Sequence, residues 1–424
     1  MSQSGLPARR TAHLLMMEIT TEGRLLPELI AGGALAQLAN DDRARAQRLA
    51  TDTLRGLDRA DRMLKPFLKK PPPDYVLNAL RLGVIELCGG EAAHGVVNAY
   101  VEIVGRNKHT QSMKGLTNAV LRKIAAEGPE GWNKRAIPLT PGWLRQPLVA
   151  AWGRDAVTGM EAAHFAGAPL DLTAKGDPEA LAKLVGGIIL PTGSVRLANA
   201  GQVSNLPGYE AGEWWVQDAA AAIPVKVLGD VKGLKVLDLC AAPGGKAMQL
   251  AAAGADVTAV EISEKRATRI AENLKRVGLQ AKTVISDAFA FDQGGFDAVL
   301  LDAPCSATGT IRRHPDLPYA KDGSEFGELI AQQEAMIDHA LTLLKPGGRL
   351  VFCTCSLLPD EGEVQVEEAL ERHPGLTTNA AALRIQGIDP AWITEEGGLR
   401  LRPDYWPELG GMDGFYVAVL TKPA

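Results

Sequence analysis

Residues 236–246 read Val-Leu-Asp-Leu-Cys-Ala-Ala-Pro-Gly-Gly-Lys, and this stretch decides the fold of the second half of the chain. The apolar run that ends near Asp238 predicts a short buried strand, and the Pro-Gly-Gly sequence after it predicts a tight turn. The helix formers of residues 246–251 predict a helix that begins directly after the turn. A helix start in this position presents backbone N–H groups to a nucleotide-like ligand.

Two familiar nucleotide motifs do not match this turn. A phosphate-binding P-loop requires glycine where Cys240 stands and serine or threonine where Ala247 stands. The Gly-x-Gly-x-x-Gly dinucleotide pattern is also absent, although Glu261 ends the next predicted strand, where it could hold a ribose. A nucleoside ligand that needs no pyrophosphate site fits better, and we expect S-adenosylmethionine.

The composition is that of an ordinary globular protein: of 424 residues, 46% are apolar and 22% are charged. This length accommodates two or three domains of about 100–200 residues each. With no export signal and no run of about 18 apolar residues, we expect a cytoplasmic location and no membrane association. The net charge of −5 does not favour nucleic acid, but the first 130 residues are mildly basic, with 18 lysines and arginines against 14 acids.

The five cysteines, an odd number in a chain without an export signal, argue against a framework of disulfides. No Cys-x-x-Cys pair or His-rich partner completes a zinc site, so we expect no bound metal. A zinc-bound cysteine cluster is the alternative, and metal analysis of the purified protein would detect it.

The first part of the chain is predicted to be a helical bundle. From Thr11 to about Ile124, apolar residues recur at intervals of three and four, the period of an amphipathic helix. The sequence Lys-Lys-Pro-Pro-Pro at 69–73 interrupts this pattern. Further helices are expected at Tyr75–Cys88, Ala92–Arg106 and Leu116–Ala126. We therefore predict an all-α domain over residues 1–127.

Prolines and short apolar pieces mark a different texture between residues 128 and 229. Short strands are predicted at Gly187–Leu190, Ser194–Leu197 and Trp214–Val216, and a short helix at Pro178–Val185. We interpret residues 128–229 as a small α+β module. Its segment Trp214–Ala220 leads into a helix and could cover the ligand pocket.

From Val231 onward, predicted strands and helices alternate, which indicates a parallel sheet with helices on both faces. The predicted strands are Lys235–Cys240, Asp256–Ile262, Lys282–Ser286, Phe296–Asp302, Arg349–Thr354 and Phe415–Leu420. The predicted helices are Gly245–Ala253, Ser263–Val277, Ser324–Leu344 and Asp360–Arg372.

Polar and cysteine residues gather at the predicted carboxyl ends of these strands, where an open α/β sheet binds its ligand. They are the turn 240–246, Glu261, Asp287, the sequence Asp302-Ala-Pro-Cys305 and the sequence Cys353-Thr-Cys355-Ser. Either acid alone is a cap or turn residue about as often as a ligand contact. Together, Glu261 and Asp287 suit a ligand with a ribose diol and an exocyclic adenine amine, since both groups need acceptors.

Cys305 and Cys355, at the ends of two predicted strands, suggest covalent chemistry beside the methyl donor. Carbon 5 of a pyrimidine is a weak nucleophile, but a thiolate that adds to carbon 6 turns the ring into an enamine that can attack a methyl group. The thiol, with an ordinary pKa of about 8.5, must be shifted toward thiolate. Asp302 could hydrogen-bond or protonate the ring, and a second thiol could assist proton loss at carbon 5 and expulsion of the first. For Cys88 and Cys353 we expect buried structural roles.

Several motifs resemble those of the RNA cytosine-5 methyltransferases of the Sun/Nop type. They are Cys240-Ala-Ala-Pro-Gly-Gly-Lys246, Asp302-Ala-Pro-Cys-Ser-Ala-Thr-Gly309 with Arg312-Arg-His-Pro-Asp316, Thr354-Cys-Ser356 and Gly411-Met-Asp-Gly-Phe415. Helical sequences at 81–87, 98–104 and 116–123 resemble the NusB-like RNA-binding domain. The resemblance covers nearly all of the chain and is closest to bacterial members that act on small-subunit ribosomal RNA. It implies a multidomain protein: a NusB-like helical bundle, the small α+β module, and a Rossmann-like class I methyltransferase domain at 230–424.

The resemblance implies a role for each motif. Cys355 is expected to be the nucleophile, Cys305 the thiol that aids release, and Asp302 a residue that faces the base. S-adenosylmethionine is expected to contact Cys240, Ala241, Ala242, Pro243, Gly244, Gly245, Lys246, Glu261, Asp287 and Asp302. In the helical domain, the candidate contacts to RNA phosphates are Arg81, Arg106, Lys108, Lys114, Arg122 and Lys123. We expect a monomer that binds RNA and not DNA.

The sequence departs from the family pattern at two places. Ala247 stands where threonine is usual, so the threonine side chain cannot take part in binding while the backbone cradle remains. Leu170–Lys175 replaces a usual Arg-x-Asn strand, which questions the RNA contacts of that module. The alternatives are methylation of transfer RNA, a DNA cytosine methyltransferase whose nucleophile would be Cys305 of the Pro-Cys turn, and a non-catalytic RNA-binding ribosome assembly factor.

Overall fold

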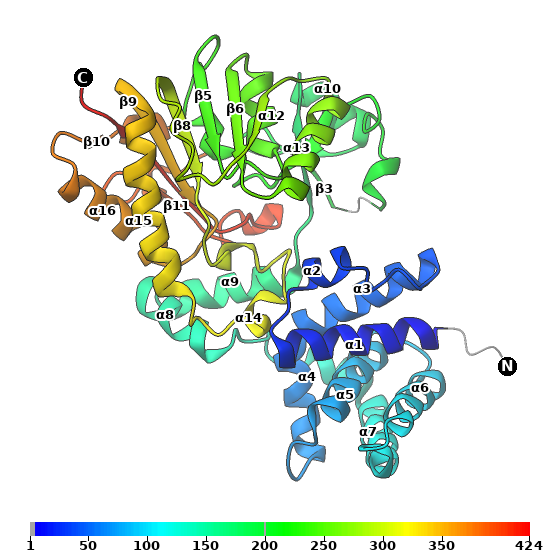
Figure 1. Cartoon of the computed structure of the whole chain (residues 1–424). Helices are drawn as coiled ribbons and strands as arrows, with labels where there is room; N and C mark the ends of the chain where they lie inside the picture. Colours follow the sequence, from blue (N-terminus) through cyan, green and yellow to red (C-terminus); the bar gives the residue numbers. More distant parts are fainter. Residues whose placement is uncertain (1–4, 199–200) are drawn as a thin grey trace. The chain divides into compact units, whose positions relative to one another are not determined.

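The computed structural model describes residues 5–198 and 201–424. The chain forms two compact units, which Figure 1 shows with their elements labelled. The first, here called the helical unit, comprises Met1–Gly167 and Ile311–Gly323, and the second, the sheet unit, comprises Ala168–Thr310 and Ser324–Ala424. Because residues 128–229 are divided between these units, the three-domain division of the sequence remains a prediction.

The helical unit is the predicted bundle of amphipathic helices. Its α-helices are α1 (Leu6–Glu22), α2 (Leu26–Ala31), α3 (Asn40–Arg55), α4 (Leu57–Leu64), α5 (Asp74–Cys88), α6 (Ala93–Arg106), α7 (Lys114–Asn133), α8 (Gly142–Trp152), α9 (Arg154–Ala166) and α14 (Leu317–Ala320). Short 3-10 helices occur at η1 (Lys65–Phe67) and η2 (Gln111–Met113). The three helices predicted after the proline run correspond to α5, α6 and α7, and the run itself lies between η1 and α5.

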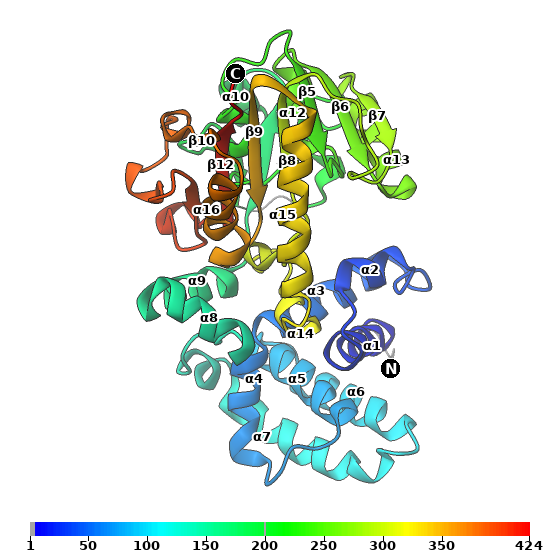
Figure 2. The same cartoon turned by 60° about the vertical axis from the view of Figure 1, so that its left-hand side comes forward.

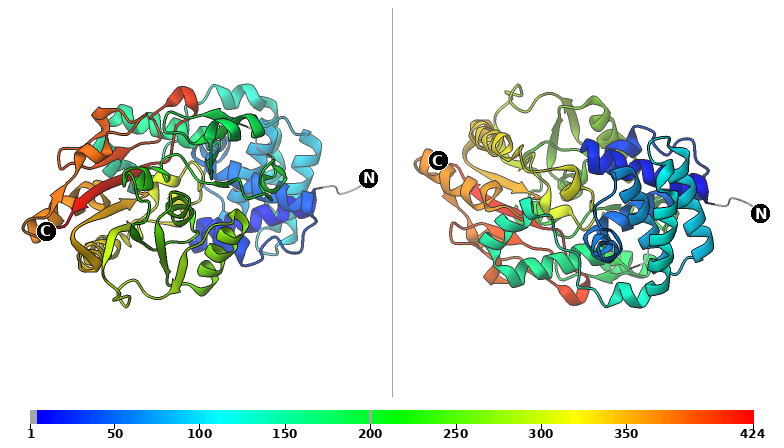
Figure 3. Two further views of the ribbon diagram at one scale, coloured as in Figure 1. Left: turned by 90° about the horizontal axis from the view of Figure 1, so that it is seen from above. Right: turned by 90° about the horizontal axis from the view of Figure 1, so that it is seen from below.

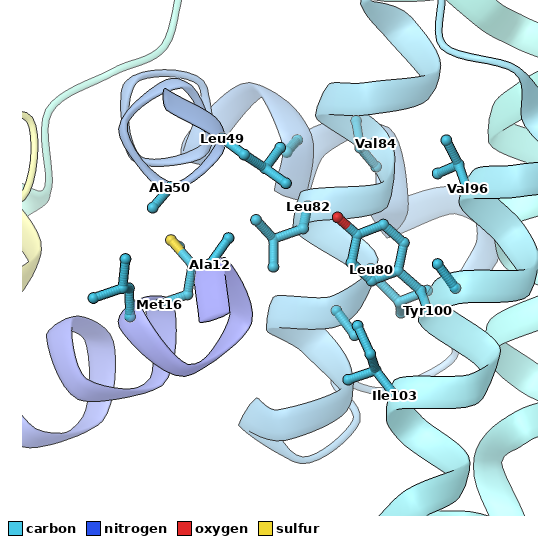
Figure 4. Close-up of a cluster of buried hydrophobic side chains, with 14 of the residues drawn as sticks. Ala12, Met16, Leu49, Ala50, Leu80, Leu82, Val84, Val96, Tyr100 and Ile103 are labelled. Carbon is cyan, nitrogen blue, oxygen red and sulfur yellow. The ribbon is translucent and has the colours of Figure 1, made fainter. Parts of the chain in front are cut away.

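The core of this bundle is built from the periodic apolar residues of its helices. Figure 4 shows Ala12 and Met16 of α1, Leu49 of α3, Leu82 of α5 and Tyr100 of α6 within one buried cluster. Viewed from below in Figure 3, these blue-to-cyan helices pack against one another. Burial of this apolar face, rather than helix propensity alone, therefore stabilises the bundle.

One carboxylate lies inside the helical bundle. Glu86 of α5 accepts hydrogen bonds from both Arg9 (2.7 and 2.8 Å) and Tyr100 (2.7 Å), and Arg45 donates a further one at 3.1 Å. Burying a charge is costly unless it is paired and hydrogen-bonded. These donors compensate the burial of Glu86, so its role is structural.

A segment from the second half of the chain also belongs to the helical unit. Asp316 accepts the backbone N–H of Leu26 at the start of α2 (2.8 Å). Arg55 donates to the carbonyl of Arg312 (3.0 Å), and the indole of Trp143 donates to the carbonyl of Pro318 (3.0 Å). The motif at 312–316, predicted to lie within the catalytic domain, thus packs with the helices, through contacts that local sequence patterns do not predict.

The sheet unit contains two sheets. Its strands are β1 (Leu170–Ala174), β2 (Ile188–Ile189), β3 (Val195–Leu197), β4 (Trp214–Val216), β5 (Lys235–Leu239), β6 (Asp256–Glu261), β7 (Lys282–Ile285), β8 (Phe296–Asp302), β9 (Leu344–Thr354), β10 (Thr377–Thr378), β11 (Leu399–Leu401) and β12 (Phe415–Thr421). Its helices are α10 (Pro178–Val185), α11 (Ile223–Lys226), α12 (Gly245–Ala252), α13 (Glu264–Val277), α15 (Phe326–Leu343) and α16 (Glu363–Arg372). Short 3-10 helices are η3 (Val203–Asn205), η4 (Thr308–Thr310), η5 (Pro359–Glu361), η6 (Ala380–Leu383), η7 (Pro390–Trp392) and η8 (Pro407–Leu409).

The large sheet has the strand order β10-β12-β9-β8-β5-β6-β7, with β11 paired to β12. Strands β9, β8, β5, β6 and β7 are parallel, as predicted. The prediction is wrong at β12, which runs antiparallel to β9, the red and orange strands of Figure 3. A parallel strand beside β9 would need a crossover connection, usually a helix, before it. The described chain between α16 and β12 contains no long helix, and β12 pairs antiparallel with the short strands β10 and β11.

Side chains that alternate along the strands build a core on each face of this sheet. On β5, Val236 packs in the core with α12 and α13, whereas Leu237 packs in the core with α15 and α16. Figure 2 shows α15 running along β8 and β9. The arrangement is the predicted Rossmann-like sheet with helices on both faces.

The small sheet has the order β2-β3-β1-β4 and is antiparallel at every pairing. Three of its strands and helix α10 correspond to predicted elements, and Leu170–Ala174 adds the central strand β1. Arg196 of β3 donates to both carboxylate oxygens of Asp171 at 2.6 Å and to the carbonyls of Leu409 and Gly411 at 2.7 Å. This buried arginine therefore joins the small sheet to the glycine-rich loop before β12.

No helix in the described part of the chain is long and apolar enough to span a membrane.

Candidate active site

The turn after β5 has an unusual backbone that its residues make possible. Cys240 has φ 63°, a left-handed conformation that is uncommon for a residue other than glycine and that is often found at functional sites. Gly244, with φ 100°, precedes α12, and a Cβ atom there would lie 3.3 Å from Cγ2 of Ile270. The turn therefore requires glycine at 244, and it places the first N–H groups of α12 at the end of β5.

A cavity of about 270 Å³ lies at the carboxyl ends of the parallel strands. Of the predicted site residues, those that line it are Cys240, Ala242, Glu261, Asp287, Asp302, Cys305 and Cys355. Ala303 and Pro304, within the predicted sequence Asp302–Cys305, also line it, and the lining residues that sequence reasoning missed are Val260, Ile262, Arg266, Ser286, Ala288, Phe289, Ala307, Gln332 and Met336. Most of these adjoin a predicted strand end, whereas Gln332 and Met336 come from α15 and had no signal in the sequence.

Five predicted cofactor contacts do not line this cavity: Ala241, Pro243, Gly244, Gly245 and Lys246. They form the turn and the start of α12, where Pro243 is exposed and Lys246 is buried. Their contact with S-adenosylmethionine remains a prediction.

Glu261 closes one side of the cavity and is almost fully buried. Its carboxylate accepts the backbone N–H of Ser263 (3.0 Å) and, more weakly, that of Ala242 (3.4 Å), and the guanidinium of Arg266 lies 3.3 Å away. A carboxylate has about four lone-pair positions, so acceptor capacity remains for a ribose hydroxyl. The end of β6 therefore fits the sugar of a nucleoside.

The rim beside Glu261 combines one acid with two apolar side chains. Asp287 is exposed and accepts the backbone N–H of Phe289 at 2.8 Å. Ile262 and Phe289 are exposed to 64% and 43% although both are apolar. Apolar surface next to a polar anchor is typical of a pocket for a flat heterocycle, so these residues fit an adenine base.

Lys246 and Asp302 form a largely buried ion pair. The Lys246 ammonium lies 2.7 Å from Asp302 Oδ2 and 5.2 Å above the ring of Phe415, and Cys353 Sγ donates to Asp302 Oδ1 at 3.5 Å. Burial acts to lower the pKa of Lys246, but the attraction of Asp302 and the hydrogen bond to it raise that pKa overall. Lys246 therefore stays charged and fixes the orientation of Asp302.

Asp238 is a second buried acid, which the sequence showed only as the end of an apolar run. It is fully buried on β5 and has no side-chain hydrogen-bond partner among the described residues, although the backbone N–H of Ala247 is close enough to lower its pKa. Burial raises the pKa of Asp238 to about 8; Lys246 opposes this rise and Asp302 adds to it. An acid within an apolar strand was the available signal, because such a residue is costly to bury.

The two predicted catalytic thiols lie side by side, with 3.5 Å between Cys305 Sγ and Cys355 Sγ. The pKa of the Cys305 thiol is raised well above its ordinary value. The hydrogen bond to Cys355 is the largest cause, and burial is the second. Cys305 therefore keeps its proton and can donate it toward Cys355. Ala307, just beyond Cys305, has φ 58°, which is a second left-handed residue in the cavity wall.

The remaining cysteines are held as protonated thiols. Burial raises the pKa of Cys88 to about 11 and that of Cys240 to about 12, and it raises the pKa of Cys353 well above its ordinary value. Cys88 and Cys353 are buried, consistent with structural roles. Across residues 5–198 and 201–424, no group of three or more histidine, cysteine or acidic side chains is arranged to hold a metal ion.

The six candidate RNA contacts of the helical unit differ in how they are engaged. Arg81 is bound to Asp61 through two 2.7 Å hydrogen bonds, and Arg106 pairs with Glu102. Arg122 donates to Asn118, and the ammonium of Lys123 lies 5.3 Å from the Phe67 ring centre. Lys108 and Lys114 are exposed and, within the described helices, take part in no ion pair. These two lysines are the better candidates for phosphate contacts.

The predicted lid does not line the cavity. Trp214 packs in the core of the small sheet and Trp215 in the core of the large sheet, while Gln217 donates to Gln249 of α12 at 3.2 Å. None of residues 214–220 is among the described cavity-lining residues. Ala247 is fully buried in the core below α12, so a threonine hydroxyl there would not reach the cavity.

Two segments of the chain match known protein families. Residues 225–421 match the 16S rRNA methyltransferase RsmB/F family, and residues 6–126 match the NusB family. The ribosomal RNA small subunit methyltransferase B of Sodalis glossinidius (strain morsitans) is 35% identical over 399 residues, which are 86% of this chain and 89% of that protein. That of Erwinia tasmaniensis is 32% identical over 434 residues, with 96% of each chain covered.

The fold as a whole also occurs in a solved structure. The crystal structure of PH0851 matches with a TM-score of 0.75 and 21% identity, and the match covers 98% of this chain and 99% of that one. At this identity the match shows a shared fold.

Proposed function

Because this chain belongs to the ribosomal RNA small subunit methyltransferase B family, which is S-adenosylmethionine-dependent, we propose that it methylates carbon 5 of a cytosine in small-subunit ribosomal RNA. One observation carries the cytosine-5 assignment: two thiols, Cys305 and Cys355, lie 3.5 Å apart in the wall of the cavity at the carboxyl ends of the parallel strands. Methylation of an oxygen or an exocyclic nitrogen needs no thiol, whereas methylation of carbon 5 requires a covalent activation of the ring.

The cavity offers a place for the cofactor at the ends of β5, β6 and β7. Glu261 is proposed to accept from the ribose, and Asp287 with Ile262 and Phe289 to hold the adenine. The backbone of the turn 240–246 is proposed to face the rest of S-adenosylmethionine, beyond its ribose and adenine. When bound, S-adenosylmethionine supplies an electrophilic methyl group.

Cys355 is proposed to be the nucleophile. Its sulfur adds to carbon 6 of the cytosine, and the electron pair displaced toward the ring makes carbon 5 nucleophilic. Asp302, held 2.7 Å from the Lys246 ammonium, is proposed to hydrogen-bond the base as electrons arrive at the ring. Cys305 Sγ lies 3.5 Å from Cys355 Sγ, within reach to donate a hydrogen bond to it before the attack.

Cys305 is proposed to aid release of the product. The hydrogen bond to Cys355 is the largest cause of its raised pKa, and formation of the C6–S bond turns the Cys355 sulfur into a weaker, thioether acceptor. Cys305 can then lose its proton to water and take the proton of carbon 5. The electron pair of the broken C5–H bond re-forms the C5=C6 double bond, and Cys355 leaves as a thiolate.

Two cysteine variants test this assignment. Cys355→Ala is expected to abolish methyl transfer to RNA while the protein stays folded. Cys305→Ala is expected to trap a covalent protein–RNA adduct, visible as a shifted band on a denaturing gel and located at Cys355 by mass spectrometry of digested adduct. Cys88→Ala, which removes a buried thiol of the helical unit, is the matched control and should form no stable adduct.

Full methylation by Cys355→Ala would refute the mechanism. Attachment of RNA at Cys305 instead would favour the type of DNA cytosine methyltransferase that uses a Pro-Cys nucleophile. Failure to bind S-adenosylmethionine in calorimetry would favour a non-catalytic assembly factor.

The RNA target is proposed from the family, and sequencing tests it directly. Bisulfite sequencing of ribosomal and transfer RNA from cells with and without the gene should show one cytosine of small-subunit RNA that loses its methyl group. Loss of methylation in transfer RNA alone would support the alternative substrate. We further propose that the protein acts as a monomer in the cytoplasm, with RNA phosphates bound by Lys108 and Lys114.

A further inference from the structure

A serine follows each of the two thiols in the sequence, and these serines meet inside the protein. Ser306 Oγ lies 3.2 Å from Ser356 Oγ, and Thr308 Oγ1 lies 3.2 Å from the first and 3.3 Å from the second. All three side chains are buried. The loops that carry Cys305 and Cys355 are thus joined by a triangle of hydroxyl groups directly behind the thiols.

Glu361 of η5 is the acceptor to which this triangle is tied. One carboxylate oxygen accepts the backbone N–H of Ser306 (2.9 Å) and the side-chain amide of Gln333 (3.0 Å), and the other accepts the hydroxyl of Ser306. The same amide of Gln333 also donates to the carbonyl of Pro304 at 2.8 Å. Glu361 therefore holds both neighbours of Cys305, Ser306 directly and Pro304 through Gln333.

The hydrogen bond to Glu361 fixes the direction of the Ser306 hydroxyl. Ser306 donates its proton to Glu361, so its oxygen is left to accept from Ser356 or Thr308. Ser356 Oγ in turn accepts the backbone N–H of Leu358 (3.0 Å), and Thr308 Oγ1 accepts that of Leu357 (2.9 Å). The network therefore extends from Glu361 through both loops without an unused donor.

Burying the carboxylate of Glu361 costs more free energy than a purely structural role would require. It is fully buried and, within the residues that the structure describes, forms no ion pair, in contrast to Glu86 with its two arginines. An apolar side chain of similar volume would fill such a site at a lower cost in free energy. Glu361 does not line the cavity, so it acts through the loops that it holds.

We infer that Glu361 is a positioning residue that holds the Cys305 and Cys355 thiols at contact distance, and that it thereby sets the rate at which the RNA adduct is released. This inference rests on the proposed function. Release breaks the C5–H and C6–S bonds and forms the C5=C6 double bond, with the proton passing to Cys305 and the electron pair of the C6–S bond leaving on Cys355. The Cys305 thiolate must reach carbon 5 while Cys355 is bound to carbon 6, so the step depends on the distance between the two sulfurs.

Two substitutions separate geometry from charge. Glu361→Gln keeps the shape: its amide oxygen can accept from Ser306 N and Gln333, and its NH2 group can donate to Ser306 Oγ, whose proton then turns toward Ser356. Glu361→Ala removes the acceptor and leaves the hydroxyl triangle untied. If geometry decides, the alanine variant is impaired and the glutamine variant is close to the wild type.

The experiment incubates full-length variants with in vitro transcribed small-subunit ribosomal RNA and methyl-labelled S-adenosylmethionine, and measures turnover together with the fraction of protein in covalent adduct. For Glu361→Ala we expect kcat to fall by about tenfold or more, with labelled adduct accumulating as in Cys305→Ala. The KM for S-adenosylmethionine should stay at the wild-type value, since Glu361 does not line the cavity. Glu86→Gln, which alters a buried carboxylate of the helical unit, controls for a general loss of stability.

Absence of adduct accumulation in a folded Glu361→Ala variant would overturn the inference, as would an equal defect in Glu361→Gln. If Glu361→Ala does not fold, Ser356→Ala decides by the same readout, because it removes the hydroxyl contacts of Ser356 to Ser306 and Thr308 but keeps Glu361, Gln333 and Ser306 in contact. Failure of the proposed function gives a different result, in which the wild-type protein methylates no cytosine and Cys305→Ala traps no adduct.

Discussion

Replacing Asp238 by asparagine should stabilise the protein at alkaline pH and leave its stability nearly unchanged at acidic pH. The carboxyl group of Asp238 is fully buried without a side-chain partner among the described residues, and burial raises its pKa to about 8 against the opposing effects of Lys246 and the backbone N–H of Ala247; an aspartate in an unfolded chain has a pKa of about 3.9. Asparagine has nearly the same shape and does not titrate. The substitution therefore removes the ionisation and little else.

The sign follows from the number of bound protons. Between pH of about 4 and about 8, the folded protein keeps the proton of Asp238, whereas the unfolded chain has lost it. The stability that this group contributes is fully present below the unfolded pKa and falls by about 1.4 kcal/mol per pH unit as the pH rises to the folded pKa. From about pH 5 to about pH 8, the advantage of Asp238→Asn should thus grow by up to about 4 kcal/mol and then level off.

Urea unfolding of both proteins across this pH range measures the difference. Asp297→Asn is the matched control, because the hydrogen bond to Lys345 lowers the pKa of Asp297, whose titration thus lies below the range tested. The difference between that variant and the wild type should be flat with pH. A flat difference for Asp238→Asn as well would show that its carboxyl group titrates normally and would refute the reasoning.

Two further predictions concern other parts of the chain. Arg196→Ala should lower the free energy of unfolding by about 3–5 kcal/mol, because it leaves the buried Asp171 without its ion-pair partner. As a control, Lys134→Ala removes an exposed ion pair with Glu130 and should lower the free energy of unfolding by less than about 0.5 kcal/mol in the same urea titration. Lys108→Glu with Lys114→Glu should weaken RNA binding and reduce the slope of log K against log salt by about 0.7–0.9 for each phosphate that the variant no longer neutralises. An unchanged slope in filter binding would place the RNA elsewhere.

Local patterns were sufficient for the elements that carry the cavity. The apolar run before Pro243 predicted β5, the turn and α12, and the strand ends predicted that Glu261, Asp302, Cys305 and Cys355 meet. These predictions succeeded because parallel strands bring their carboxyl ends to one edge whatever the intervening loops contain.

What local patterns missed depends on contacts between distant residues. The antiparallel direction of β12 depends on its pairing with β9, β10 and β11, and the sequence of β12 alone does not predict it. Glu361 lies in a region predicted only as a helix start, and its partner Ser306 is 55 residues away in the sequence. A buried acid is recognisable as functional only when its donors are known.

Asp238 and Glu361 are two buried acids of the sheet unit that should affect turnover in different ways. Asp238 lies near the Lys246 ammonium and Asp302, so above its pKa of about 8 a second carboxylate competes for Lys246. That competition weakens the hold of Lys246 on Asp302, the residue proposed to face the base. Glu361 is surrounded by neutral donors from Ser306 and Gln333, which fix the thiols through geometry. An alkaline decline in turnover should thus arise at Asp302, while release of the adduct, for which Glu361 is proposed to position the thiols, should not follow it.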